Sequence, residues 1–279
     1  MRIKKLILSL TKNIYYFLVN RLSNVLRIQP DNNSKFLVSL TTYNKRINRV
    51  YLTIESLFNQ DEPASKVVLF LCEEDIPTKG MPRSLIRLEA RGLEIKVVEK
   101  NIRSYKKLSC INMIEDYEDY NFVVTVDDDI FYPKNFLSGF SNNIKERNDE
   151  VLCYRGKTIS FDSDNKILDY SKWPLSNNLS DWILPTGVSG VCYPIKILNE
   201  HFFDQEAFLT YCPTADDIWY KLCCLEQGVA SRLVSEESIH FVPVFYFNAD
   251  SLESINVGDN KNTIQIEKGL KYFNIPFER

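Results

Sequence analysis

The sequence predicts an α/β protein with a mixed, mostly parallel central sheet and helices on both of its faces. Short apolar runs alternate with helical segments along the first half of the 279 residues, which is the pattern of βαβ units with right-handed crossovers. The strand candidates are almost continuously apolar, as expected for strands that are covered on both faces. Because the second half departs from this alternation, we expect the sheet to be mixed.

Four strands and their intervening helices are predicted before residue 133. Apolar residues at helical or continuous spacing define the helices and strands, and Gly92 closes one of the helices. The predicted elements are a strand over 36–41, a helix ending near Asn59, a strand over 66–71, a helix over 81–91, a strand over 92–100, a helix over 107–117 and a strand over 121–126.

The second half contains shorter elements and a long polar segment. Residues 171–194, rich in Trp, Ser, Asn and Gly, are expected to form a flexible substrate loop, in which Gly187 and Gly190 let the backbone approach a ligand closely. The other predicted elements are a helix over 133–146, a strand over 151–155, two strands within 158–170 joined by a turn at 163–166, a helix from Thr214 or Asp216 to Gly228, strands over 231–234 and 240–247 and a helix over 260–273.

Residues 121–133, NFVVTVDDDIFYP, join an apolar strand to three consecutive carboxylates. The carboxyl end of a strand is where open α/β sheets bind ligands. Alternate residues of an extended chain point the same way, so Asp127 and Asp129 are expected to share a face. A divalent cation, held by one or two carboxylates and substrate phosphates, would remove their repulsion. The alternative is an acidic turn that caps a helix started by Pro133.

Composition excludes several other classes of site. A net charge of −3 gives no overall basic field, so nucleic acid is not an expected partner. No GxGxxG or GxxxxGK[ST] motif occurs. With two histidines and no CxxC pair, a zinc site is not expected. The seven scattered cysteines indicate buried thiols in a reducing compartment.

Residues 1–34 are predicted to form a basic amphipathic segment and a linker ahead of the main domain. The first 28 residues carry six basic side chains and no acidic one, and polar residues interrupt every apolar run. We therefore expect an interfacial helix on an anionic membrane surface rather than a transmembrane span. The alternative is a helix packed on the domain or on a partner subunit. The expected location is cytoplasmic, peripheral on the inner face of the cell membrane.

Three segments resemble bacterial glycosyltransferases of the GT-A fold, akin to the family 2 enzymes. They are VSLTTYNKRINRVYLTIESLFNQ at the start of the domain, VTVDDDIFYP in its middle, and TADDIWYK after a TGVSGVCYP loop. The similarity spans roughly residues 36–275. It implies a GT-A-like, Rossmann-type domain over 35–279, with a nucleotide-sugar-binding half (35–133) and an acceptor-binding half (134–279).

The resemblance implies a metal-dependent enzyme of surface polysaccharide synthesis. It would move a sugar from a nucleotide-diphosphate sugar, with UDP-sugars expected first, to a hydroxyl of a glycan or lipid-linked acceptor. Mn²⁺ or Mg²⁺ would bind Asp129, with Asp127 near the metal or the donor ribose. Asp217 would be the base of an inverting reaction, with Asp216 as the next candidate. Instead of the family 2 acidic pair followed by Gly-Ser, this chain has Glu73, Glu74 and Asp75.

Further candidates complete the predicted site. Lys106 and Lys107 are possible phosphate partners or a solvated helix start, and His240 is a third metal ligand or a core histidine. Asp216 and Asp217 are also placed to cap a helix. The candidate donor-binding residues are Thr41, Tyr43, Arg46, Glu73, Lys106, Lys107, Asp127, Asp128 and Gly187, and the candidate metal ligands are Asp127, Asp129 and His240.

Two other functions fit parts of this pattern. A phosphohydrolase of the haloacid dehalogenase type also places a DxD motif after an apolar strand, but normally after the first strand, whereas three strand candidates precede it here. A membrane-attached scaffold could keep the fold without chemistry, although the intact carboxylates argue against it. Metal binding and donor hydrolysis would distinguish these functions.

Overall fold

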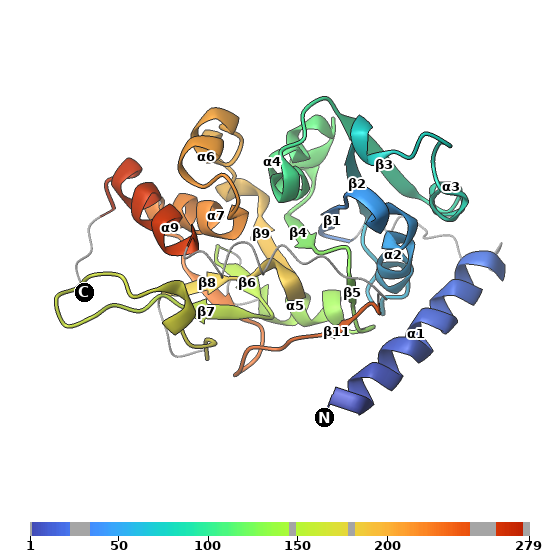
Figure 1. The fold of residues 1–279 in the computed structure, drawn as a ribbon, viewed down its shortest axis with the longest axis horizontal. Coiled ribbons are helices and arrows are strands. Elements are labelled where there is room, and N and C mark those ends of the chain that lie inside the picture. Colours follow the sequence, from blue (N-terminus) through green and yellow to red (C-terminus); the bar gives the residue numbers. More distant parts are fainter. Residues whose placement is uncertain (1, 23–33, 145–148, 178–181, 246–260, 276–279) are drawn as a thin grey trace.

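The computed structural model describes residues 2–22, 34–144, 149–177, 182–245 and 261–275, and a seven-stranded sheet runs through the molecule (Figure 1). Its strand order is β10-β6-β9-β4-β1-β2-β3. The amino-terminal strands pair in parallel, as the sequence predicts: β1 (Phe36–Thr41), β2 (Lys66–Cys72), β3 (Leu93–Val98) and β4 (Phe122–Val126).

The second half adds three strands to the same sheet and makes it mixed. β9 (Val191–Pro194) runs antiparallel to β4 and to β6 (Val151–Cys153), while β10 (Ser231–Leu233) pairs in parallel with β6. Two small antiparallel pairs lie outside this sheet, β5 (Ile130–Phe131) with β11 (Val242–Pro243) and β7 (Gly156–Thr158) with β8 (Ile183–Pro185).

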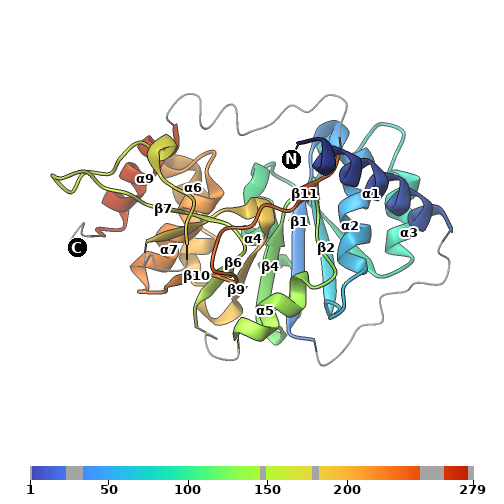
Figure 2. The ribbon, with the colours of Figure 1, turned by 90° about the horizontal axis from the view of Figure 1, so that it is seen from below.

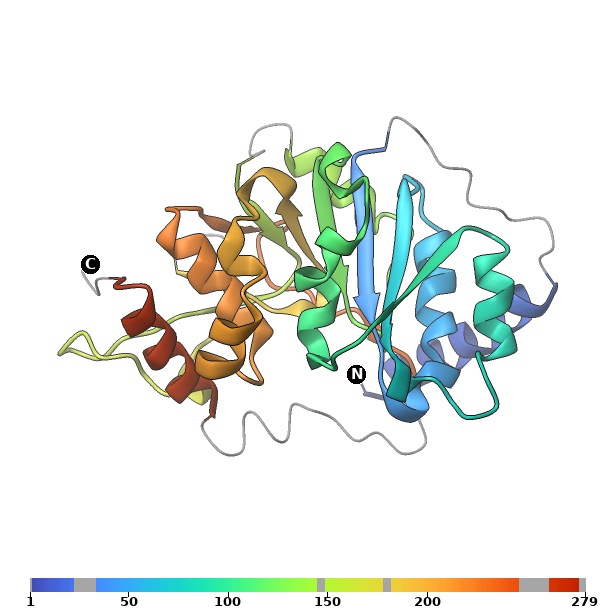
Figure 3. The same ribbon diagram turned by 90° about the horizontal axis from the view of Figure 1, so that it is seen from above.

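Helices cover both faces of the sheet, which confirms the predicted layers (Figures 2 and 3). Alternate residues of β1 enter opposite cores, since Leu37 packs in one cluster and Val38 in the other. One core contains α2 (Val50–Phe58), α3 (Arg83–Glu89) and α5 (Phe136–Ile144). The other contains α4 (Lys106–Ser109), α6 (Gln205–Tyr211), α7 (Asp216–Glu226) and α9 (Lys261–Tyr272).

Three sequence predictions are wrong in this part of the fold. The two strands expected within 158–170 are reduced to the end of β7 and an isolated bridge between Phe161 and Ile167. The helix expected over 107–117 is reduced to the short α4 and two 3₁₀ turns. Ile111 and Ile114 are buried at a three-residue spacing that α-helices and 3₁₀ turns share, so the apolar pattern did not distinguish them. The loop expected over 171–194 contains β8 and β9. These strands are only three and four residues long and lie within a polar segment, so the sequence pattern did not identify them as strands.

Helix α1 (Arg2–Leu22) packs on the domain against α2, α3 and β11, at the opposite end of the molecule from α9 (Figure 1). The alternative of a helix packed on the domain therefore describes its position. Within the described residues, no helix combines the length and apolarity that crossing a membrane requires. The predicted linker lies mostly outside the described residues. All seven cysteines are buried and unpaired.

Candidate active site

The three consecutive aspartates lie in a turn after β4, so strand alternation does not govern them. Arg46 pairs with Asp128 through Nη1 at 2.6 Å and with Asp129 through Nη2 at 2.8 Å. Arg46 therefore brings Asp128 and Asp129 together, while the charge of Asp127 also acts on Asp129. Asp127 forms its own ion pair, with Lys107.

Asp128 anchors this turn in the protein interior. Only 4% of the residue is exposed, and its carboxylate accepts from the Thr42 hydroxyl as well as from Arg46. Burial raises the pKa of Asp128 to about 7, against the opposing effect of Arg46. Each of its two oxygens thus has a partner within the chain.

Lys107 joins the acidic turn to the start of α7. Its Nζ lies 3.0 Å from Oδ1 of Asp127 and 3.2 Å from Oδ2 of Asp216. Ser104 donates to the other oxygen of Asp216 at 2.8 Å. Burial disfavours the ammonium, but the surrounding aspartates outweigh it and hold the pKa of Lys107 well above its usual value. Carboxylates on elements about 90 residues apart in sequence therefore share one cation.

Gly187 lies beside Lys107, Asp127 and Asp217, at the centre of this cluster. Its N–H donates to Oδ2 of Asp217 at 3.0 Å. A Cβ at this position would lie 2.7 Å from Nζ of Lys107 and 3.3 Å from Oδ1 of both Asp127 and Asp217. Any side chain here would enter the space that these three groups face, so glycine keeps that space open.

Asp217 has the environment of a proton acceptor that works near neutral pH. Burial and the neighbouring Asp216 raise its pKa to about 7, while Lys107 and the Gly187 amide oppose the shift. The capping alternative is not supported: the residue before α7 is Ala215, and no side chain caps this helix end. Thr214, the other predicted cap, instead contacts Gln265 through its N–H.

Three of the predicted donor-binding residues have surroundings different from those of Lys107. Lys106 is buried and pairs with the buried Asp75 at 2.6 Å, so only the second lysine of the pair faces the carboxylates. Glu73 is exposed at the end of β2. The Thr41 hydroxyl donates to the backbone oxygen of Phe70.

Of four further side chains that contact the site residues, one was predicted from the sequence and three were not. Tyr43, a predicted donor-binding residue, contacts Arg46, whose Cζ lies 5.2 Å from the centroid of the Tyr43 ring. Sequence reasoning missed Thr42, Asp75 and Ser104. Each of these three residues lies close in sequence to a predicted residue. The direction of the backbone decides which of the neighbouring side chains points into the site, and the sequence does not show that direction.

Asp127 and Asp129 fit a hard divalent cation. Their side chains are 33% and 28% exposed, and their ion pairs are formed through Oδ1 of Asp127 and Oδ2 of Asp129. Burial and the charge of Asp127 raise the pKa of Asp129, and a bound cation would relieve that repulsion. Carboxylate oxygens are the ligands that Mg²⁺ and Mn²⁺ prefer.

Among the described residues, His240 does not complete a three-residue metal site with Asp127 and Asp129. The β5–β11 pairing places Val244 beside Asp129, with a hydrogen bond of 2.7 Å between their backbones, and His240 lies four residues earlier on that segment. In the described ranges, no three His, Cys, Asp or Glu side chains are grouped to hold a metal. The structure therefore does not assemble the predicted triad.

Comparison with known proteins establishes the fold. No family model and no curated protein matches the sequence. The mannosyltransferase PcManGT of Pyrobaculum calidifontis, in complex with GDP-Man and Mn²⁺, matches with a TM-score of 0.51 and 13% identity, over 99% of this chain and 81% of that chain. TarS of S. aureus, residues 1–349, matches with a TM-score of 0.50 and 20% identity, over 74% of this chain and 59% of that chain.

This chain thus matches 59% of the length of the TarS structure and most of PcManGT. At these identities the similarity is one of fold. The predicted GT-A-like arrangement, a mixed and mostly parallel sheet with helices on both faces, is confirmed, and the chain is similar to GT-A glycosyltransferases.

Proposed function

We propose that this protein is a glycosyltransferase that moves a sugar from a nucleotide-diphosphate sugar to a hydroxyl of a glycan or lipid-linked glycan, in surface polysaccharide synthesis. The observation that carries the proposal is the Lys107 cluster. It brings Asp127, at the end of β4, together with Asp216 and Asp217, at the start of α7. A GT-A-like fold presents these groups at the carboxyl edge of its parallel strands.

The donor side of the site consists of Asp127, Asp129, Arg46 and Lys107. Departure of a nucleoside diphosphate builds negative charge on the leaving phosphate, and fixed cations stabilise that charge in the transition state. A Mn²⁺ or Mg²⁺ ion held by Asp127 and Asp129 would supply further electrophilic stabilisation when bound. The solved structure of PcManGT, a protein of similar fold, is a complex with GDP-Man and Mn²⁺. The donor of this chain is therefore proposed by class, with UDP-sugars and GDP-sugars as the first candidates.

The acceptor side consists of Asp217, held in place by Gly187. The Gly187 amide fixes Oδ2, so Oδ1 is the oxygen that would take the proton from the attacking hydroxyl. A pKa of about 7 suits a general base at neutral pH. Asp216, which is buried and paired with Lys107 and Ser104, positions the cluster. A base opposite the leaving group would give inversion of the anomeric centre.

Binding of nucleotides with and without metal tests this proposal. We expect UDP or GDP to raise the melting temperature in the presence of Mn²⁺ and to do so much less with chelator present. We expect Asp129→Asn to lower Mn²⁺-dependent nucleotide affinity by about tenfold or more, because it removes one ligand charge. The matched control is Asp119→Asn. Asp119 is an exposed aspartate just before the amino end of β4, and this variant should bind as the wild type does.

The other functions predict different results. Nucleotide affinity that is independent of Mn²⁺ and unchanged in Asp129→Asn would overturn the metal assignment. Release of phosphate from phosphomonoesters, without sugar transfer, would identify a phosphohydrolase. A chain that binds neither nucleotide nor metal would be a non-catalytic scaffold.

A further inference from the structure

Helix α1 is attached to the domain through its polar side chains. Ser9, Asn13, Tyr16 and Asn20, spaced by three and four residues, form one stripe along it. Ser9 donates to the backbone oxygen of Pro243 at 2.6 Å, and Asn20 donates to Glu55 at 2.8 Å. The Tyr16 ring stacks on Phe131 with centroids 5.4 Å apart. The polar stripe therefore faces the protein.

The apolar side chains of α1 consequently face outward. Among the described residues, ten of the seventeen exposed large hydrophobic side chains belong to this one helix, which concentrates them on a single surface. Ile7 and Ile14, on the side away from the stripe, are 56% and 62% exposed. The helix thus reverses the usual arrangement of a surface helix, and such a surface marks an interaction site. We call it the outer face, made of Ile3, Leu6, Ile7, Leu10, Ile14, Phe17, Leu18 and Leu22.

We propose that the outer face of α1 binds an anionic lipid surface, with its apolar side chains at the boundary between headgroups and acyl chains. The positive charge of α1 favours anionic lipid as the partner. Lys4, Lys5 and Arg21 are exposed on α1, and no acidic residue occurs among the first 28. Lys4 and Arg21 lie among the apolar residues of the outer face by helical position. A second copy docked through the same face would bring like charges together, whereas lipid phosphates would neutralise them.

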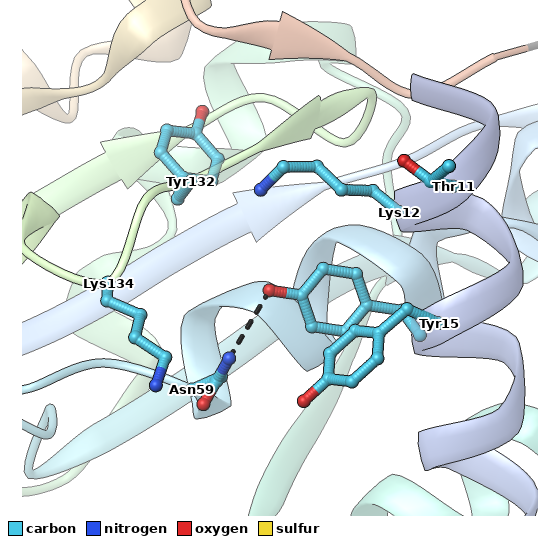
Figure 4. A pocket seen from close by; sticks show the side chains of 7 residues that line it. Thr11, Lys12, Tyr15, Asn59, Tyr132 and Lys134 are labelled. Atoms are coloured by element: carbon cyan, nitrogen blue, oxygen red, sulfur yellow. Dashed lines mark hydrogen bonds between the residues drawn. The ribbon is translucent and has the colours of Figure 1, made fainter. Parts of the chain in front are cut away.

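A cavity of about 320 Å³ on the flank of α1 adds to this charge pattern (Figure 4). Lys12, on α1, and Lys134, after β5, approach it from opposite sides, and Tyr15 and Asn59 help to line it. Neither lysine forms an ion pair with a carboxylate of the described chain. Burial without such a partner lowers the pKa of Lys12. An anionic headgroup at this cavity would provide the missing counter-charge.

The contacts between α1 and the domain also set the position of the outer face relative to the candidate site. Ser9 contacts the strand β11, and the next residue after this strand, Val244, bonds the backbone of Asp129. Deletion of α1 would therefore disturb the acidic turn as well as the outer face. Substitutions outside the polar stripe are the cleaner test, and vesicle binding reports on them without any need for transferase activity.

The experiment measures binding of the full chain to vesicles of phosphatidylglycerol or phosphatidylcholine at low and high salt. We expect binding to phosphatidylglycerol that weakens with salt. Ile7→Gln with Ile14→Gln should lower affinity on the order of 100-fold, since each isoleucine contributes about tenfold. Lys4→Gln with Lys12→Gln should lower it by about 25-fold at low salt, at about fivefold for each basic group.

The matched control is Leu209→Gln with Ile264→Gln, two exposed apolar positions on helices α6 and α9. This variant should bind vesicles as the wild type does, and all variants should keep the wild-type melting temperature. Failure of the wild type to bind phosphatidylglycerol, or equal binding by the Ile7 and Ile14 variant, would overturn the proposal. A dimer in solution that dissociates in that variant would also overturn it, and would assign the outer face to a second copy.

Discussion

The carboxylate cluster and helix α1 bury polar groups in two different ways. In the cluster, charged groups are buried against each other, so that Lys107 and Arg46 neutralise carboxylates from two parts of the chain. Along α1, mostly neutral side chains are buried, and amides and a hydroxyl make the contacts to the domain. The first arrangement leaves charge facing a small space, and the second leaves apolar surface facing outward.

This difference indicates two kinds of ligand. A compact group of partly exposed carboxylates and cations suits a small, highly charged molecule, and the pKa values near 7 at Asp128 and Asp217 follow from the burial of like charges. A helix-long apolar surface with basic residues suits an extended partner. Replacing single residues in each region tests whether the two regions are as separate as this comparison requires.

The largest effect is expected for Lys107→Met. Removing a buried ammonium leaves Asp127 and Asp216 without their shared cation, so the free energy of unfolding should fall by about 3 kcal/mol. Urea denaturation measures the change. Lys221→Met is the matched control, because Lys221 is equally buried on α7 but donates only to the Ser231 hydroxyl. Similar losses in both variants would show that burial, and not the carboxylate cluster, determines the cost.

Asp217→Asn should lower the rate of sugar transfer by roughly 100-fold or more, the scale of general-base catalysis. The amide keeps the shape of the side chain but cannot accept the proton. Donor affinity, measured by titration calorimetry, should stay close to that of the wild type. A normal transfer rate would remove Asp217 from the mechanism and make Asp216 the residue to test.

Asn20→Ala tests the inner side of α1. The Asn20 amide donates to Glu55 and to the Ser84 backbone, and its oxygen accepts from Arg87 at 2.7 Å. Losing these buried contacts should lower the free energy of unfolding by about 2 kcal/mol. Thr11→Ala, at an exposed position of the same helix, should change it by less than about 0.5 kcal/mol. Equal stability of the two variants would mean that the polar stripe does not hold the helix.

The smallest effect is expected from pH. Asp217 acts as a base only when it is deprotonated, and its pKa is raised to about 7, so activity should fall as the pH decreases through 7. At pH 6 the transfer rate should be about fivefold lower than at pH 7, because the deprotonated fraction falls from about one half to about one tenth. A rate that stays constant down to pH 5 would show that the base is an unperturbed carboxylate or another group.

The strands of the amino-terminal half were predictable because their pattern is local. Residues 36–41, 66–71 and 121–126 are apolar runs long enough to identify buried strands, and β1, β2 and β4 follow them closely. Strand β9 was not predictable in the same way. It is four residues long within a polar segment, and its place beside β4 depends on antiparallel pairing with residues about 70 positions away.

The candidate site divides in a similar manner. Asp127, Lys107, Gly187 and Asp217 were all predicted, and the structure brings them together. The choice of Lys107 over Lys106 and the pairing of Asp128 with Asp129 were not, since both depend on which way a turn or a short helix directs consecutive side chains.

The sequence alone determined the types of residues available: an acidic turn after a buried strand, an acidic pair near the start of a helix, and a basic amino-terminal segment without acids. Only the tertiary structure decided how they are paired and which way they face. Ion pairs such as Lys107 with Asp127 and Asp216 join elements far apart in the chain. The outward apolar face of α1 exists because its polar stripe found hydrogen-bond partners on the domain, and the hydrophobic pattern of a helix does not reveal which side will be docked.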